Sequence, residues 1–129
     1  MVKAKISSLF AVLTASLLIS GPPAFAHHSM SMYDRSRDAT FKATITDFNW
    51  ANPHSLITFT VTDEHGNSEK WVAEGPGPNR LANHGWSRDS LKPGDQVTIV
   101  GNPNKDGSPT MRFEKVIFAN GDQLEARPR

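Results

Sequence analysis

Apolar and polar side chains alternate along much of the chain beyond residue 39, with the two-residue period of strands that bury one face. In residues 40–50, for example, Phe41, Ala43 and Ile45 alternate with polar neighbours. The alternation slips by one residue at Asp47, which predicts a β-bulge in a long strand that must bend. The same period predicts five strands in all: 40–50, 55–62, 68–74, 96–101 and 110–118.

Glycine and proline mark the connections between these strands. Pro53 fixes the corner between the first two strands, because proline lacks an N–H and holds the preceding residue in an extended conformation. Residues 79–84 have one apolar face and end at Gly85, which predicts a short helix after the third strand. Pro93 and Gly94 occupy the central positions of a predicted type II turn. Further turns are expected at residues 63–67, 104–107 and 120–121.

The predicted order is therefore three strands, a short helix and two strands. This is the chain order of the OB-fold, a five-stranded, partly open β-barrel. The sequence thus predicts an all-β, OB-like barrel over residues 40–121, with the short helix between strands three and four, and a small β-sandwich is the alternative architecture. Residues 27–39 are polar and without periodicity and are expected to form a flexible arm, and residues 122–129 are expected to be a loose tail.

The first 26 residues have the three parts of a secretory signal peptide in order. Lys3 and Lys5 are followed by an apolar run over residues 9–19 and then by the small-x-small pattern of Ala24 and Ala26. The run is about ten residues long, whereas a membrane-spanning helix needs about 20. We expect cleavage after Ala26, delivery to the periplasm or the exterior, and no membrane attachment of the mature chain.

Composition bounds the mature protein further. Cleavage would leave 129 − 26 = 103 residues, enough for one domain with a modest core. The signal contains two of the 14 Lys and Arg, so 12 would remain against 13 Asp and Glu. This near-neutral balance gives no electrostatic basis for binding nucleic acid or a membrane surface. The chain has no cysteine, which excludes disulfides, thiolate metal sites and thiol catalysis, and no motif in it predicts an enzyme.

Histidines gather at the predicted mature N-terminus. Cleavage at the expected position would make His27 the first residue, so that its α-amino group and imidazole could chelate one metal ion, with His28 or His54 adding another imidazole. Nitrogen ligands of this kind suit Cu(II), and thioethers also favour copper over Mg²⁺ or Ca²⁺. We therefore predict a copper site at these histidines, with Met30 and Met32 as accessory ligands. The alternatives are that the arm histidines are only solvated and that His54 hydrogen-bonds a turn carbonyl.

Two tryptophans are candidates for a binding face. Trp50 lies at the end of the first predicted strand and Trp86 follows the predicted helix. In OB-folds the loop between strands one and two borders the usual ligand face, so these rings could stack on a small ligand or a partner protein. The alternative is that they, like Trp71, fill the core of a small barrel.

Five motifs stand out along the chain: His27-His28-Ser29, Trp50-Ala51-Asn52-Pro53-His54, Pro78-Asn79-Arg80-Leu81, the run GWSRDSLKPGD over residues 85–95, and Lys105-Asp106-Gly107-Ser108. Together they resemble a family of small exported bacterial proteins of unknown function. The resemblance covers residues 27–121 and implies export and a single domain. It implies no activity.

The last predicted strand resembles a segment of small periplasmic copper chaperones, which are OB-type barrels that bind Cu(I) with His, Met and a Trp face. Residues 110–113 (TMRF) are similar to their methionine segment, and this resemblance adds Met111 to the predicted copper ligands. Ser108 and Pro109 stand where the chaperones have a preceding methionine, so no other ligand is carried over.

Together these features predict a small exported binding protein that binds or delivers copper through its mature N-terminal histidine. The alternative, of a different class, is an interaction module without a metal. Such a module would bind a protein partner or a small ligand with Trp50 and Trp86 on its OB face.

Overall fold

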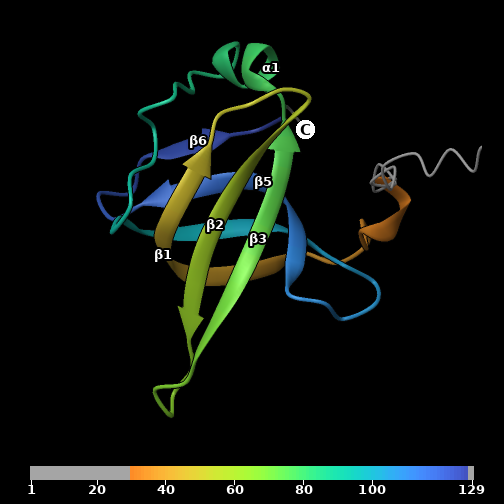
Figure 1. Ribbon diagram of the computed structural model, residues 1–129, viewed down its shortest axis with the longest axis vertical. Coiled ribbons are helices and arrows are strands. Elements are labelled where there is room, and N and C mark those ends of the chain that lie inside the picture. Colours follow the sequence, from red (N-terminus) through yellow and green to blue (C-terminus); the bar gives the residue numbers. More distant parts are fainter. Residues whose placement is uncertain (1–29, 128–129) are drawn as a thin grey trace, which may run out of the picture.

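The computed structural model describes residues 30–127, so the predicted signal peptide, its cleavage site, His27 and His28 lie outside the described residues. Six strands and two short helices make up the described part (Figure 1). In chain order these are η1 (a 3-10 helix, Met30–Met32), β1 (Ala39–Asn49), β2 (His54–Thr62), β3 (Ser68–Pro76), α1 (Pro78–Ala82), β4 (Gln96–Pro103), β5 (Thr110–Phe118) and β6 (Gln123–Glu125). Neither helix in this range is long and apolar enough to cross a membrane.

The strands form one sheet in the order β3-β2-β1-β4-β5-β6, and a parallel pairing of β3 with β5 closes it. Residues 72–74 of β3 pair with residues 110–112 of β5 along this seam. The result is a closed five-stranded barrel with β6 added beside β5 and α1 placed between β3 and β4 (Figure 1). The all-β, OB-like prediction is confirmed, and the sandwich alternative is wrong because the sheet closes on itself.

The bulge predicted in the first strand is present. Ile45 pairs with Phe59 of β2 and Asp47 pairs with Thr58, so Thr46 is left without a partner in that strand. A bulge of this kind bends the strand and changes which side its later residues face. As a result both Ile45 and Phe48, three residues apart, contact the same core.

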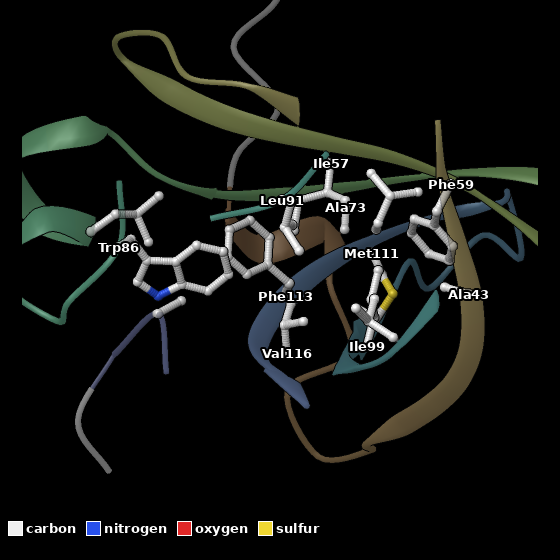
Figure 2. Packing of buried hydrophobic residues seen from close by; sticks show 14 residues of the cluster. Ala43, Ile57, Phe59, Ala73, Trp86, Leu91, Ile99, Met111, Phe113 and Val116 are labelled. Carbon is white, nitrogen blue, oxygen red and sulfur yellow. The ribbon is translucent and has the colours of Figure 1, made fainter. Parts of the chain in front are cut away.

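Apolar residues from all five barrel strands, α1 and the segment after it fill the interior. The alternation of buried and exposed positions expected from the sequence holds in β2, where Ser55, Ile57 and Phe59 are buried. Figure 2 shows the packed cluster, which extends from Phe59 and Ala43 near one end to Trp86 at the other. Burying large aliphatic and aromatic side chains stabilises a domain by about 1.5–3 kcal/mol each, so this cluster is the main source of stability.

The turn before β4 has the predicted geometry. Asp95 donates its backbone N–H to the carbonyl of Lys92 over 3.1 Å, which places Pro93 and Gly94 in the two central positions. Gly94 has φ +92°, the left-handed conformation that a type II turn requires there. The turn sets the direction of β4, in which Val97 and Ile99 face the core as their spacing predicts.

The C-terminal segment corrects a prediction, because residues 122–127 are not a loose tail. β6 pairs with β5, and Leu124 lies opposite Val116. Beyond it, Ala126 is buried and donates its N–H to the carbonyl of Glu114 over 2.7 Å. Glu114 is the extra residue of a second bulge, where β5 shifts register against β4, and its carbonyl is therefore free to accept this bond.

The N-terminal segment corrects another. Residues 30–38 were expected to be part of a flexible arm, but they lie along β4 and the loop that follows it. Tyr33 is 4% exposed and bridges to Asn104, and Asp34 donates its N–H to the carbonyl of Pro103 over 2.8 Å. The backbone N–H of Lys105 donates in turn to the carbonyl of Met32 over 2.9 Å. The polar sequence does not reveal this docking, because it combines one buried aromatic side chain with backbone hydrogen bonds that leave no pattern in the sequence.

Candidate functional site

His54 is a predicted metal ligand whose side chain solvent can reach. It is the first residue of β2, directly after the Asn52–Pro53 corner, and its side chain is 42% exposed. The pairing of β2 with β3 brings it beside the end of β3. Its Nδ1 lies 3.2 Å from both the Glu74 carboxylate oxygen Oε1 and the Gly75 carbonyl oxygen. The predicted contact with a carbonyl is therefore present, but this carbonyl belongs to β3 rather than to a turn, and it is accompanied by a carboxylate contact that was not predicted.

Glu74 joins His54 to the N-terminal segment. The Tyr33 hydroxyl donates a hydrogen bond of 2.7 Å to Oε2 of Glu74, while Oε1 of the same carboxylate faces His54. Burial raises the pKa of the Tyr33 phenol, and the hydrogen bond to Glu74 and the negative charge of Glu74 raise it further. Tyr33 therefore stays protonated at neutral pH and remains a donor. One carboxylate thus holds both the imidazole and the segment that follows the predicted mature N-terminus.

These contacts decide which nitrogen of His54 is available. Both acceptors face Nδ1, so we assign the proton of the neutral ring to Nδ1, which leaves the lone pair on Nε2. No residue in the described range hydrogen-bonds Nε2. Metal-binding histidines in proteins are typically held in this way, by a carboxylate or carbonyl that accepts the proton of the other ring nitrogen. The observed geometry therefore fits an imidazole ready to bind a metal through Nε2.

The structure does not assemble a complete metal site from the described residues alone. Within residues 30–127 no group of three or more His, Asp or Glu side chains lies close enough to hold an ion. His65 lies in the exposed hairpin loop and His84 beyond α1. Met30 and Met32 form η1, and Met32 is partly buried. A site at His54 would need ligands in addition to the His, Asp and Glu side chains of this range.

Met111 lies in the core rather than at a site that solvent can reach. Its side chain is fully buried, and Figure 2 shows its sulfur within the hydrophobic cluster. Methionine fills irregular gaps in cores well because its side chain is unbranched and flexible. The placement corrects the resemblance to the copper chaperones at this position, since a thioether without solvent access has a packing role.

The two candidate tryptophans also pack inward. Trp86 is 3% exposed, and its ring centroid lies 5.5 Å from that of Phe113. Its indole Nε1–H donates a hydrogen bond of 2.9 Å to the carbonyl of Glu125. A ring buried in this way has no face for an external ligand, so the prediction for Trp86 is wrong and the core alternative holds. Trp50 is partly buried against Phe48, with ring centroids 5.7 Å apart in an edge-to-face arrangement.

A shallow groove lies on another side of the barrel. It has a volume of about 380 Å³ and is lined by residues of β1, β2, β4 and β5, several of them threonines (Thr44, Thr60, Thr62 and Thr98). Lys42 is the one ionisable side chain in its lining, and no metal-binding histidine, carboxylate or thioether is present there. The groove is therefore separate from the His54 site and offers it no ligands.

Sequence reasoning missed Glu74, which contacts His54, and Tyr33, which donates a hydrogen bond to Glu74. The available signals were that Tyr33 is the single tyrosine of the chain, set in an otherwise polar segment, and that Glu74 alternates with apolar positions in β3. Neither signal identifies a partner, because the hydrogen bond between them joins residues 41 positions apart.

The chain belongs to a family of unknown function, DUF6152, whose model matches residues 15–112. This confirms the resemblance to a family without an assigned activity. No curated protein and no solved structure matches the chain.

Proposed function

We propose that this is an exported copper-binding protein in which His54 and the mature N-terminal His27 bind one Cu(II) ion. The proposal includes cleavage after Ala26, which makes the α-amino group and the imidazole of His27 available as ligands. The observation that supports it is the His54 ring, whose Nδ1 is held by Glu74 and the Gly75 carbonyl while Nε2 remains available.

The anchored N-terminal segment supports the pairing of these two histidines. Tyr33 and His54 bind the two oxygens of one carboxylate, so Tyr33 lies near the imidazole. His27 precedes η1 by three residues, which span at most about 10 Å when extended, and η1 adds about 2 Å per residue, or about 6 Å, up to Tyr33. That reach is sufficient for His27 to meet a metal ion bound at Nε2 of His54.

The donor set favours copper among the metals. An amine and two imidazoles are intermediate nitrogen ligands, for which Cu(II) has the highest affinity of the common divalent ions. His28 would supply a further imidazole, and Met30 and Met32 would supply thioethers that stabilise Cu(I). Met111 is left out because it is buried in the core. Binding or delivery fits better than catalysis, since Glu74, the carboxylate that contacts the imidazole within residues 30–127, is already engaged by His54 Nδ1 and by Tyr33.

The test is a Cu(II) titration of protein that begins at His27, compared with the same protein carrying one extra glycine before it. The extension blocks chelation by the α-amino group and should weaken binding by more than about tenfold. His54→Ala should have a similar effect, whereas His65→Ala, which removes an exposed histidine from the β2–β3 hairpin, should not. Glu74→Gln should weaken binding by about 10- to 100-fold, the usual cost of losing a partner that orients a metal-binding histidine.

Two results would contradict the proposal. If His54→Ala and His65→Ala weaken binding equally, copper binds the histidines without a defined site. If correctly processed protein does not bind copper at all, the metal function is wrong and the interaction module without a metal becomes the better explanation. That module would have to use a surface other than Trp86, whose indole is buried.

A further inference from the structure

The positive charges of three arginines from distant parts of the chain act on a fourth, Arg127, close to β5. Arg112 lies on β5 itself, and Arg127 follows Ala126, whose N–H bonds the carbonyl of Glu114 two residues along the same strand. Arg80 belongs to α1, which lies at the same end of the barrel as β6 (Figure 1). Arg35 lies in the turn after Tyr33, on the segment that runs beside β4. We call these four residues the arginine cluster.

Arg112 is the fixed centre of this cluster. It is 5% exposed, and its Nε and Nη2 donate to Oδ1 of Asn102 over 3.2 and 2.9 Å. Nη2 also donates to Oε1 of Glu114 over 2.8 Å. Asn102 is itself held because its Nδ2 donates to the Arg37 carbonyl and to the Asp38 carboxylate, both over 3.1 Å. The network fixes the guanidinium of Arg112 and leaves it little freedom to turn toward a ligand.

Arg127 has a donor without an acceptor. Its Nε is buried and has no hydrogen-bond partner among the described residues. Burial lowers the pKa of the Arg127 guanidinium, and the positive charges of Arg112, Arg80 and Arg35 lower it further, with Glu114 acting in the opposite direction. Three positive charges thus act on Arg127 against one neighbouring carboxylate, which is already bonded to Arg112. A buried unpaired donor and unbalanced like charges both cost free energy unless an anion compensates them.

We propose that the arginine cluster is a binding site for a small tetrahedral oxyanion of the phosphate class, held by Arg127, Arg80 and Arg35 beside the fixed charge of Arg112. Guanidinium groups bind oxyanions strongly because their planar donors match the spacing of two oxygens. A tetrahedral anion has oxygens enough for several guanidiniums from different directions, whereas a carboxylate has two. Arg80 and Arg35 are exposed, so an anion can reach these two guanidiniums from solvent. The site does not depend on the proposed copper ligands.

The test uses inorganic phosphate as the probe, titrated into the full mature protein at constant pH and ionic strength and followed by ³¹P NMR or calorimetry. We expect saturable binding of one phosphate, with sulfate competing because it has the same shape. Arg127→Gln and Arg80→Gln should each weaken binding by about tenfold or more, the usual effect of losing a charged hydrogen bond. Arg88→Gln is the matched control, since Arg88 is exposed and lies outside the cluster, and it should bind phosphate as the wild type does.

Arg112 is not used as a test position, because removing a buried guanidinium would disturb folding. The melting temperature of each variant should stay close to that of the wild type, so that a loss of binding reports the site. Absence of saturable phosphate binding by folded wild-type protein would overturn the proposal, and so would equal weakening by Arg88→Gln. Tighter binding of an acidic peptide than of phosphate would also overturn it, because the cluster would then recognise a carboxylate-bearing partner.

Discussion

Gly101 lies where β4 and β5 leave no room for a Cβ atom, and replacing it with alanine should destabilise the barrel severely. A Cβ at this position would overlap the backbone carbonyl oxygen of Arg112 and would come within 2.8 Å of the Met111 Cε atom. Met111 is fully buried and cannot swing away, and the carbonyl belongs to the paired strand. The two strands would therefore have to separate next to the Asn102–Arg112 hydrogen bonds.

The loss of stability expected for Gly101→Ala can be compared with that of a control variant. Overpacking in a core costs about 1–3 kcal/mol, and a clash with backbone belongs at the upper end of that range. For a domain of this size 1 kcal/mol lowers the melting temperature by about 4–8 °C, so Gly101→Ala should lower it by about 12 °C or more. Gly66→Ala is the control, because Gly66 has φ +81° but nothing lies within 4 Å of a Cβ placed there. Its cost should be about 1 kcal/mol, from backbone strain alone.

Thermal unfolding followed by circular dichroism, with urea titrations to obtain the free energy, measures both variants. Gly101→Ala should also disturb the arginine cluster, because Arg112 and Asn102 lie beside the strands that the substitution strains. If Gly101→Ala melts no lower than Gly66→Ala, the close approach of β4 and β5 is wrong. The register of the second bulge, from which that approach follows, would then be wrong as well.

Two further substitutions test the docking of the terminal segments. Trp86→Phe removes the indole N–H that donates to the Glu125 carbonyl. It should lower the free energy of unfolding measured by urea titration by about 1 kcal/mol, and it should speed hydrogen exchange at the Ala126 amide. Unchanged exchange at that amide would show that this bond does not hold β6. Tyr33→Phe removes the donor to Glu74 while keeping the buried ring, and should cost about 1.5 kcal/mol or more because the acceptor is charged. An unchanged free energy of unfolding in Tyr33→Phe would contradict the shared role of Glu74.

The barrel itself was predictable because its determinants are local. Alternation of apolar residues identifies the strands, and the one-residue slip at Asp47 locates the bulge of β1. Proline and glycine at positions 93 and 94 determine the turn before β4, and the left-handed conformation observed at Gly94 agrees. Each of these signals depends on residues within a few positions of one another, so no knowledge of distant contacts is needed.

The candidate sites were less predictable because their residues meet only after folding. His54 could be chosen from its position after Pro53, but its orientation depends on Glu74, which lies 20 residues further along the chain. Arg112 occupies a strand position that alternation assigns to solvent, yet it is buried because the N-terminal segment and Asn102 surround it. Met111 and Trp86 show the opposite error, because both were predicted to bind a ligand and both are buried in the core. The sequence around such a residue does not distinguish a sulfur or aromatic ligand from a core side chain.

Both candidate sites arise along the seam that closes the barrel. Glu74 of β3 and Arg112 of β5 are register partners across the parallel pairing, so both sites begin from adjacent positions of the sheet. In an isolated five-stranded barrel these outward-facing charges would be solvated. Here residues 30–38 bring Tyr33 to Glu74 and hold Asn102 beside Arg112, and the segment after β6 brings Arg127 to the same strand. The docking of the two segments that flank the barrel therefore holds in place charged side chains that would otherwise be solvated.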